Sequence, residues 1–183
     1  FAASLRDFMN DPAGTARGCN ITVPFKFEAA ALASQVSARA TLAGAANILS
    51  FTAGGIHADN TDGVGLVDDI QRNAGVALAG RDVLLIGAGG AAAGVLGPLI
   101  EARPARIAIA NRTHPRAAAL AERHQALALL QQTELTTTNL QGVQGHFDVI
   151  SNATASSLGG TGVPVPASVL RPGALAGDLM YGP

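Results

Sequence analysis

Apolar residues follow different patterns in the two parts of this chain, and the change falls near residue 82. In the first part, short apolar runs predict strands over residues 18–23 and 47–51. An Ala-rich segment at 27–36 predicts a helix, and residues 53–55 are typical of a turn. Apolar residues at helical spacing predict a further helix over 63–73, which we expect to join two lobes.

Strands and helices alternate after residue 82. The continuous apolar run at 83–86 is typical of a strand buried on both faces of a parallel sheet. The remaining predicted elements are strands at 106–110, 147–151 and 174–179 and helices at 91–102 and 116–124. This alternation predicts an α/β fold with a doubly wound parallel sheet. We therefore expect one lobe over residues 1–62 and a second over residues 63–183.

The composition and net charge argue against some classes of binding partner. Hydrophobic residues make up 48% of the chain, so a core can form, and the net charge of -1 gives no strong basic field. Nucleic acids and anionic membranes are therefore poor candidates. The 18 uncharged residues at 83–100 reach the length of a membrane span. Their five glycines and one proline instead divide them into a strand, a turn and a helix.

The cysteine and histidine content predicts neither a disulfide nor a metal centre. Cys19 is the only cysteine, which fits a reducing compartment such as the cytoplasm, and we expect it to be a small buried core residue. The four histidines lack metal-ligand spacing, so solvated or capping roles are expected. The chain starts at Phe1 without Met and ends at Pro183 just after an apparent strand. We expect it to be an internal piece of a longer protein.

A Gly-rich turn with the dinucleotide-binding pattern follows the strand predicted at 83–86. Its sequence is Gly87-Ala88-Gly89-Gly90-Ala91-Ala92, with Ala92 in the place of the third glycine. The first glycine permits a tight turn, the second lets the backbone approach a pyrophosphate, and a small third residue lets helix and strand pack closely. The start of the helix offers N–H groups to the phosphates. The alternative is a packing turn that binds nothing.

The residues after the next strand indicate which dinucleotide would bind. NAD sites carry an acidic residue about 20 positions after the glycines, whereas this chain has Asn111-Arg112-Thr113 and then Arg116. The two arginines can grip a 2′-phosphate through charge-assisted bonds, and the Thr113 hydroxyl can add a bond or cap the helix. We therefore favour NADP. The alternative is that Thr113 is only a helix cap and both arginines are solvated.

Two chargeable residues precede the Gly-rich turn, each in a backbone-constrained segment. Lys26 ends Asn20-Ile21-Thr22-Val23-Pro24-Phe25-Lys26, and Asp62 lies in Asp59-Asn60-Thr61-Asp62-Gly63. Hydride reduction of a ketone needs a proton for the developing alkoxide, and Lys26 can supply it while Asp62 holds the lysine or binds a substrate hydroxyl. Spacing alone leaves open that Lys26 is a solvated residue and Asp62 a helix N-cap. It also does not decide which of the two moves the proton.

Several segments together resemble the shikimate dehydrogenase family, in its order and with its spacing over essentially the whole chain. They are the Lys26 and Asp62 segments just quoted, Leu42-Ala43-Gly44-Ala45-Ala46-Asn47, the glycine turn, Asn111-Arg112-Thr113 and Asn152-Ala153-Thr154. The resemblance implies NADPH-dependent reduction of 3-dehydroshikimate to shikimate, in the shikimate pathway. It makes residues 1–62 a substrate-binding lobe and 63–183 a Rossmann-like NADP domain.

The resemblance also implies roles for individual residues. Lys26 would be the catalytic lysine and Asp62 its partner. The substrate would be bound by Thr22 and Asn47, supported by Asn20, and by Tyr181 at the lip of the pocket. The cofactor would be bound by the residues of the glycine turn from Gly87 to Ala91, by Asn111, Arg112, Thr113 and Arg116, by Asn152 and Thr154, and by Leu179 near the nicotinamide. The protein is expected to be a cytoplasmic monomer or homodimer whose partner is a small-molecule substrate.

The chain also departs from the family pattern. Ala46 and Ile48 flank Asn47, where the family often has Val and Thr. Ala155 follows Thr154 where the family has Ser, so the turn near the nicotinamide is expected to differ. The family's N-terminal Ser-x-Ser pair and its C-terminal Gln and Gly are absent, so we expect the chain alone to be inactive or weak. Two rival functions remain: a quinate/shikimate dehydrogenase with relaxed cofactor use, and a non-catalytic NADP-binding regulatory module.

Overall fold

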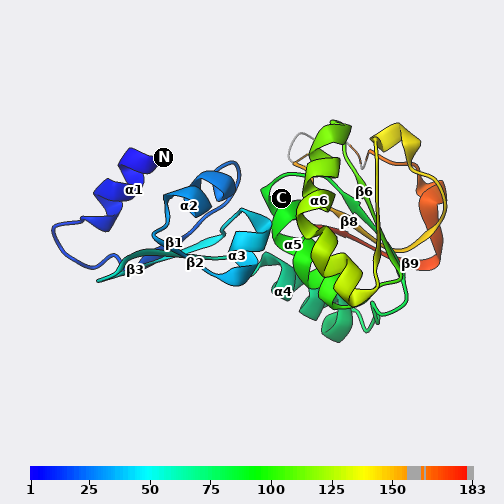
Figure 1. Ribbon diagram of the computed structural model, residues 1–183, viewed down its shortest axis with the longest axis horizontal. Helices are drawn as coiled ribbons and strands as arrows, with labels where there is room; N and C mark the ends of the chain where they lie inside the picture. The colour runs from blue at the N-terminus through cyan, green and yellow to red at the C-terminus, as the bar shows by residue number, and fades with distance from the viewer. Residues whose placement is uncertain (156–161, 163, 181–183) are drawn as a thin grey trace.

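A computed structural model describes residues 1–155, 162 and 164–180, and these residues form two β-sheets (Figure 1). The first sheet has the strand order β1-β3-β4-β2. Its strands are β1 (Gly18–Asn20), β2 (Gln35–Val36), β3 (Ile48–Thr52) and β4 (Gly55–Asp59), and its helices are α1 (Ala2–Met9), α2 (Lys26–Leu32) and α3 (Ala38–Ala43). Leu5 of α1, Ala29 of α2 and Leu49 of β3 share a small core.

The helix predicted over 27–36 is wrong at its C-terminal end. α2 ends at Leu32 because Ala33 is extended, with ψ 141°. The next residues then pair with β4, where Gln35 lies opposite His57 in a parallel register. The backbone N–H of Ser34 and that of Ser37 also donate to β4 carbonyls, at 2.9 and 3.0 Å. Sheet hydrogen bonds therefore outweigh the helix propensity of the alanines.

The second sheet in the described part of the chain has five parallel strands in the order β7-β6-β5-β8-β9. They are β5 (Asp82–Ile86), β6 (Arg106–Ala110), β7 (Glu134–Thr138), β8 (Phe147–Asn152) and β9 (Leu170–Asp178). Strand order reverses between β5 and β8, which makes the sheet doubly wound and confirms the predicted fold class. Such a reversal is where ligands bind in open α/β sheets.

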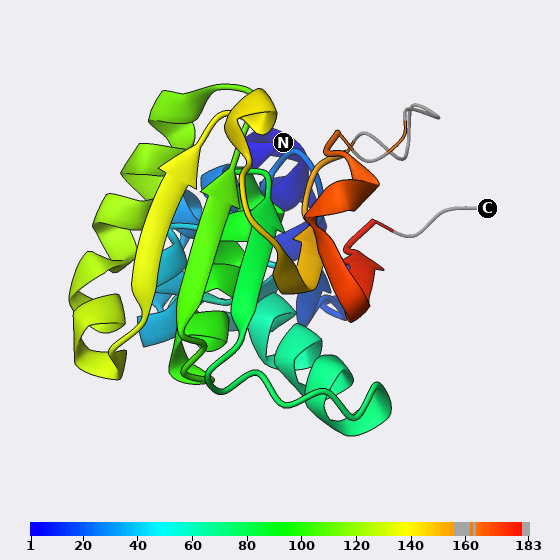
Figure 2. The same cartoon turned by 90° about the vertical axis from the view of Figure 1, so that its right-hand side faces the viewer.

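Helices cover the two faces of this sheet unequally. α5 (Gly90–Glu101) and α6 (His114–Gln131) pack on the face that carries Val83 and Leu85. Within the described residues, the face of Leu84 and Ile86 is met by short helical turns, η2 (Leu140–Gly142) and η4 (Ala167–Val169). Figure 2 looks onto that second face, with the strands in front of α5 and α6. β5 is buried on both faces, as its apolar run predicts.

A helix joins the two sheets, as predicted. α4 (Asp62–Asp68) continues into the π-helical turn η1 (Asp69–Asn73) and packs against α5. A Cβ on Gly63 would lie 2.6 Å from the carbonyl oxygen of Gly94 and from Cγ of Pro98. The absence of a side chain at Gly63 therefore lets α4 approach α5 closely. The lobe boundary between residues 62 and 63 stays a prediction.

Two expectations about single residues need correction. Cys19 is half-buried against the first core rather than fully buried, although burial still raises the pKa of its thiol. His124 is neither solvated nor a cap, because α6 places it inside with 0% exposure. No group of three or more His, Cys, Asp or Glu residues in the described ranges is arranged to hold a metal. None of the helices in those ranges is long and apolar enough to cross a membrane.

Candidate functional site

Lys26 and Asp62 meet across the junction of the two sheets. Lys26 is the first residue of α2 and Asp62 the first residue of α4. Nζ of Lys26 donates to Oδ2 of Asp62 at 2.6 Å, and the two side chains are 12% and 20% exposed. Lys26 is therefore not a solvated residue. Asp62 is not an N-cap, since Thr61 holds that position and makes no side-chain cap bond.

Two asparagines fix the Asp62 carboxylate and the backbone that carries it. Nδ2 of Asn47 donates to Oδ1 of Asp62 at 2.8 Å, and Oδ1 of Asn47 accepts from the N–H of Thr61 at 2.9 Å. Asn60 is 2% exposed; its Oδ1 accepts from the N–H of Asp62 at 3.1 Å, and its Nδ2 donates to the carbonyl of Ala45 at 2.9 Å. Both oxygens of Asp62 are thus held by side-chain donors, one charged and one neutral.

Asn60 is a site residue that sequence reasoning missed. An Asn two positions before a helical Asp forms an Asx turn with its own backbone, and that spacing was the available signal. The neighbouring Asp59 is fixed as well, because it accepts from Ser37 at 2.6 Å and from Nε of Arg39 at 2.7 Å. The Arg39 hydrogen bond holds the pKa of Asp59 well below its usual range.

The glycine turn lies at the reversal point of the second sheet. Gly87 has φ +113°, and a Cβ there would lie 3.1 Å from the backbone C and O of Ala153, so a glycine is needed. α5 starts at Gly90 after the N-cap Gly89, which supplies no side-chain cap. The first N–H groups of α5 are therefore available to an anion, as a pyrophosphate site requires.

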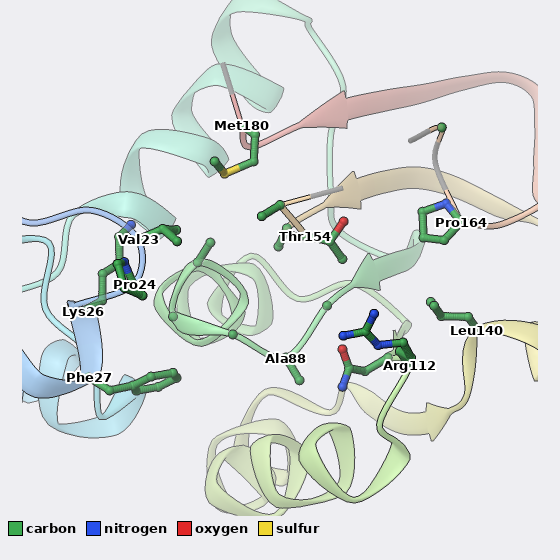
Figure 3. A pocket seen from close by; sticks show the side chains of 18 residues that line it. Val23, Pro24, Lys26, Phe27, Ala88, Arg112, Leu140, Thr154, Pro164 and Met180 are labelled. Carbon is green, nitrogen blue, oxygen red and sulfur yellow. The ribbon is translucent and has the colours of Figure 1, made fainter. Parts of the chain in front are cut away.

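A cavity of about 660 Å³ joins these features (Figure 3). Lys26, Pro24 and Phe27 lie on one side of it, and Arg112 and Leu140 on the other, with the glycine turn between them. The predicted residues that line it are Lys26, Gly87, Ala88, Gly89, Gly90, Ala91, Asn111, Arg112 and Thr154. A Cβ on Gly90 would lie 3.0 Å from Cβ of Lys26, so the lysine stem rests on the start of α5.

The other predicted cofactor residues lie beside the cavity rather than in its lining. Thr113 is the N-cap of α6 without a side-chain cap bond, and Arg116 is exposed. Asn152 is 2% exposed; it donates to Asp178 at 2.9 Å and accepts from the Thr154 hydroxyl at 2.8 Å, which makes it a support for that loop. The N–H of Leu179 donates to the Asn152 carbonyl, and the next residue, Met180, lines the cavity instead.

Of the predicted substrate residues, only Asn47 is described as lying next to the Lys26–Asp62 pair. Asn47 adjoins the lysine through Asp62, and its amide is already bonded to Asp62 and Thr61. Asn20, the last residue of β1, and Thr22 are exposed outside the cavity lining. Tyr181 lies outside the described residues. The roles of these residues stay predictions.

Comparisons with known proteins agree on one family. Residues 69–159 match the family model of shikimate / quinate 5-dehydrogenase, and residues 2–49 match the shikimate dehydrogenase substrate binding domain. The shikimate dehydrogenase (NADP(+)) of Acidovorax sp. (strain JS42) is 65% identical over 183 residues, which are 100% of this chain and 64% of that protein. The chain thus spans somewhat under two thirds of the length of this relative.

Solved structures similar to this chain include one with the same enzyme name. The crystal structure of an Ael1 enzyme from Pseudomonas putida has a TM-score of 0.82 and 41% identity, covering 100% of this chain and 64% of that one. Shikimate 5-dehydrogenase from Thermus thermophilus, solved in complex with NADP(H) and shikimate, has a TM-score of 0.73 and 30% identity. It covers 90% of this chain, which spans 59% of the Thermus protein.

Proposed function

Since this chain belongs to the shikimate/quinate dehydrogenase family, we propose that its protein catalyses the reversible, NADP-dependent reduction of 3-dehydroshikimate to shikimate. The observation that carries the proposal is the 2.6 Å contact of Lys26 with Asp62 beside the glycine turn. It unites a proton donor with a dinucleotide-type site in one cavity. The relatives named above support the substrate and the cofactor.

Lys26 and Asp62 would manage the proton of this reaction. Bound NADPH supplies the hydride, and the carbonyl oxygen that becomes an alkoxide needs a proton. An ammonium has three N–H donors, so Lys26 can keep its bond to Asp62 and direct another at the substrate oxygen. Asp62 fixes the direction of Nζ, and Asn47 fixes Asp62. Such general acid–base catalysis contributes about 10²–10⁴-fold.

The residues on the far side of the cavity fit NADP. The glycine turn and the start of α5 would hold the pyrophosphate. Arg112 lies in the lining next to Asn111, where a guanidinium binds a 2′-phosphate through charge-assisted bonds. Thr113 and the exposed Arg116 begin the adjoining helix and would add to the same phosphate site. Asn152 and Thr154 would shape the loop near the nicotinamide, and Leu179 would lie near the nicotinamide as well.

We also propose how the chain divides into lobes, where the protein is found and in which oligomeric state. We assign residues 1–62 to the substrate-binding lobe and 63–183 to the NADP lobe, because the two sheets lie on either side of that boundary. Asn20, Thr22 and Tyr181 contribute to the substrate pocket in this proposal. We further propose that the protein is cytoplasmic and is a monomer or a homodimer. The lone cysteine fits a reducing compartment such as the cytoplasm.

Steady-state kinetics of the full-length protein test the proposal, with shikimate and quinate each assayed against NADP and NAD. We expect the highest kcat/KM for shikimate with NADP. A higher kcat/KM for quinate with NAD would replace the proposal by the quinate-oxidising function that the family model also names. No turnover with any of the four pairs would favour the non-catalytic NADP-binding module.

A further inference from the structure

A second cavity, of about 460 Å³, lies between four helices. Its walls come from α3, α4, α5 and α6, and it shares no lining residue with the cavity that contains Lys26. Most of the lining is apolar, with Leu42, Val64 and Leu127 from three of the helices. Arg39 and Glu101 are the charged residues of the lining. Arg39 is already bound to Asp59.

His124 contributes the unusual polar group of this cavity. It is fully buried, and its Nδ1 lies 2.9 Å from the carbonyl oxygen of Leu120. A carbonyl only accepts, so Nδ1 carries the proton and Nε2 is left as an acceptor. Among the described residues, no protein group donates to this buried Nε2. A buried acceptor without a donor costs free energy, which a ligand that donates to it would recover.

Gly97 of α5 lies beside the buried Nε2 of His124. A Cβ on Gly97 would lie 4.0 Å from Nε2 of His124 and 3.3 Å from Cδ2 of Leu42. A methyl group would therefore fill the space between the imidazole and α3. Burial also lowers the pKa of His124, with Arg123 acting in the same direction, so the ring is neutral and Nε2 keeps its lone pair.

We propose that this cavity binds a small uncharged molecule with an apolar body and one hydroxyl or amide N–H, which donates to Nε2 of His124. The walls favour an uncharged body, because they are mostly apolar and their two charged residues, Arg39 and Glu101, are exposed, with Arg39 already bound to Asp59. A few precisely placed polar groups in an apolar pocket are typical of small-molecule sites. The ligand would touch α3 from one lobe and α4 to α6 from the other. The proposal is independent of the proposed dehydrogenase activity, since neither Lys26 nor Asp62 lines this cavity.

Fluorine NMR of the full-length protein with para-fluorophenol and fluorobenzene tests this site. The two probes share a ring of similar size and differ in the hydroxyl donor. One neutral hydrogen bond corresponds to about a three- to tenfold tighter Kd for the phenol. His124→Leu should abolish this preference, whereas His124→Gln should retain part of it, because its amide oxygen accepts. The matched control is Gln125→Leu, at the exposed neighbouring position of α6, and it should bind like wild type.

Gly97→Ala provides an independent variant in case His124→Leu does not fold. It leaves His124 in place and puts a methyl group 4.0 Å from Nε2, so it should weaken the phenol more than fluorobenzene. The proposal is overturned if wild type binds neither probe up to the solubility limit. It is equally overturned if the phenol preference survives in either His124→Leu or Gly97→Ala.

Discussion

The exchange Asp62→Asn removes the charge that holds Lys26 and leaves the side chain almost the same size. Asp62 accepts from Lys26 at 2.6 Å and from Asn47 at 2.8 Å, one donor on each oxygen. Asn has a single carbonyl oxygen, so its NH₂ group must face one of these two donors. Hydrogen bonds to charged groups contribute about 1.5–3 kcal/mol. At about 1.4 kcal/mol for each tenfold in rate, loss of the Lys26 bond in the transition state lowers kcat by about 10–100-fold.

Steady-state oxidation of shikimate by NADP, with full-length protein, measures this change, and circular dichroism checks that the variant is folded. The matched control is Asp68→Asn on the same helix, where the carboxylate meets Arg72 at 3.5 Å and both side chains are well exposed. Surface pairs of that kind contribute about 0–1 kcal/mol, so kcat should not change. A folded Asp62→Asn variant whose kcat equals that of Asp68→Asn would refute the role of the pair.

Three further predictions concern other parts of the site. Arg112→Ala should raise the KM for NADPH more than that for NADH, since only NADPH carries the 2′-phosphate; equal changes would remove that assignment. Asn60→Ala should lower the free energy of unfolding by about 1–3 kcal/mol, because the buried carbonyl it serves loses its donor; an unchanged denaturant midpoint would contradict this. Arg39 depresses the pKa of Asp59, so this pair stabilises the fold above the ordinary Asp pKa of about 3.9. The stability gap between wild type and Arg39→Ala should therefore shrink as pH falls below that value, and a constant gap would exclude the effect.

The second sheet was predictable from the sequence because its central strands are apolar on both faces. The run at 83–86 and the following glycines indicated both the strand and the tight turn. β7 escaped prediction because Glu134–Thr138 lies at the edge of the sheet, where its threonines are only half-buried. The two residues of β2 are too few to show an alternation of apolar and polar side chains. They form a strand because they pair with the neighbouring β4.

The sequence predicted part of the cavity lining, but not the geometry of the site. Motif residues identified Lys26 and Asp62, yet their contact depends on the close packing of α4 on α5, which spacing cannot give. The solvated or capping role expected for His124 was wrong, because it was inferred from the residue type and not from the position on the helix. Ala117, Leu120 and Ala121 recur at helical spacing before it on α6, and that period places His124 on the buried face.

Single-turnover hydride transfer in Lys26→Ala tests the central claim most directly. Full-length protein would be mixed with saturating shikimate and NADP, and formation of NADPH followed by stopped-flow absorbance. We expect the rate to fall by about 10²-fold or more, with the Kd for NADP unchanged because the glycine turn is intact. Hydride transfer at the wild-type rate in a folded Lys26→Ala protein would contradict the proposed role of Lys26.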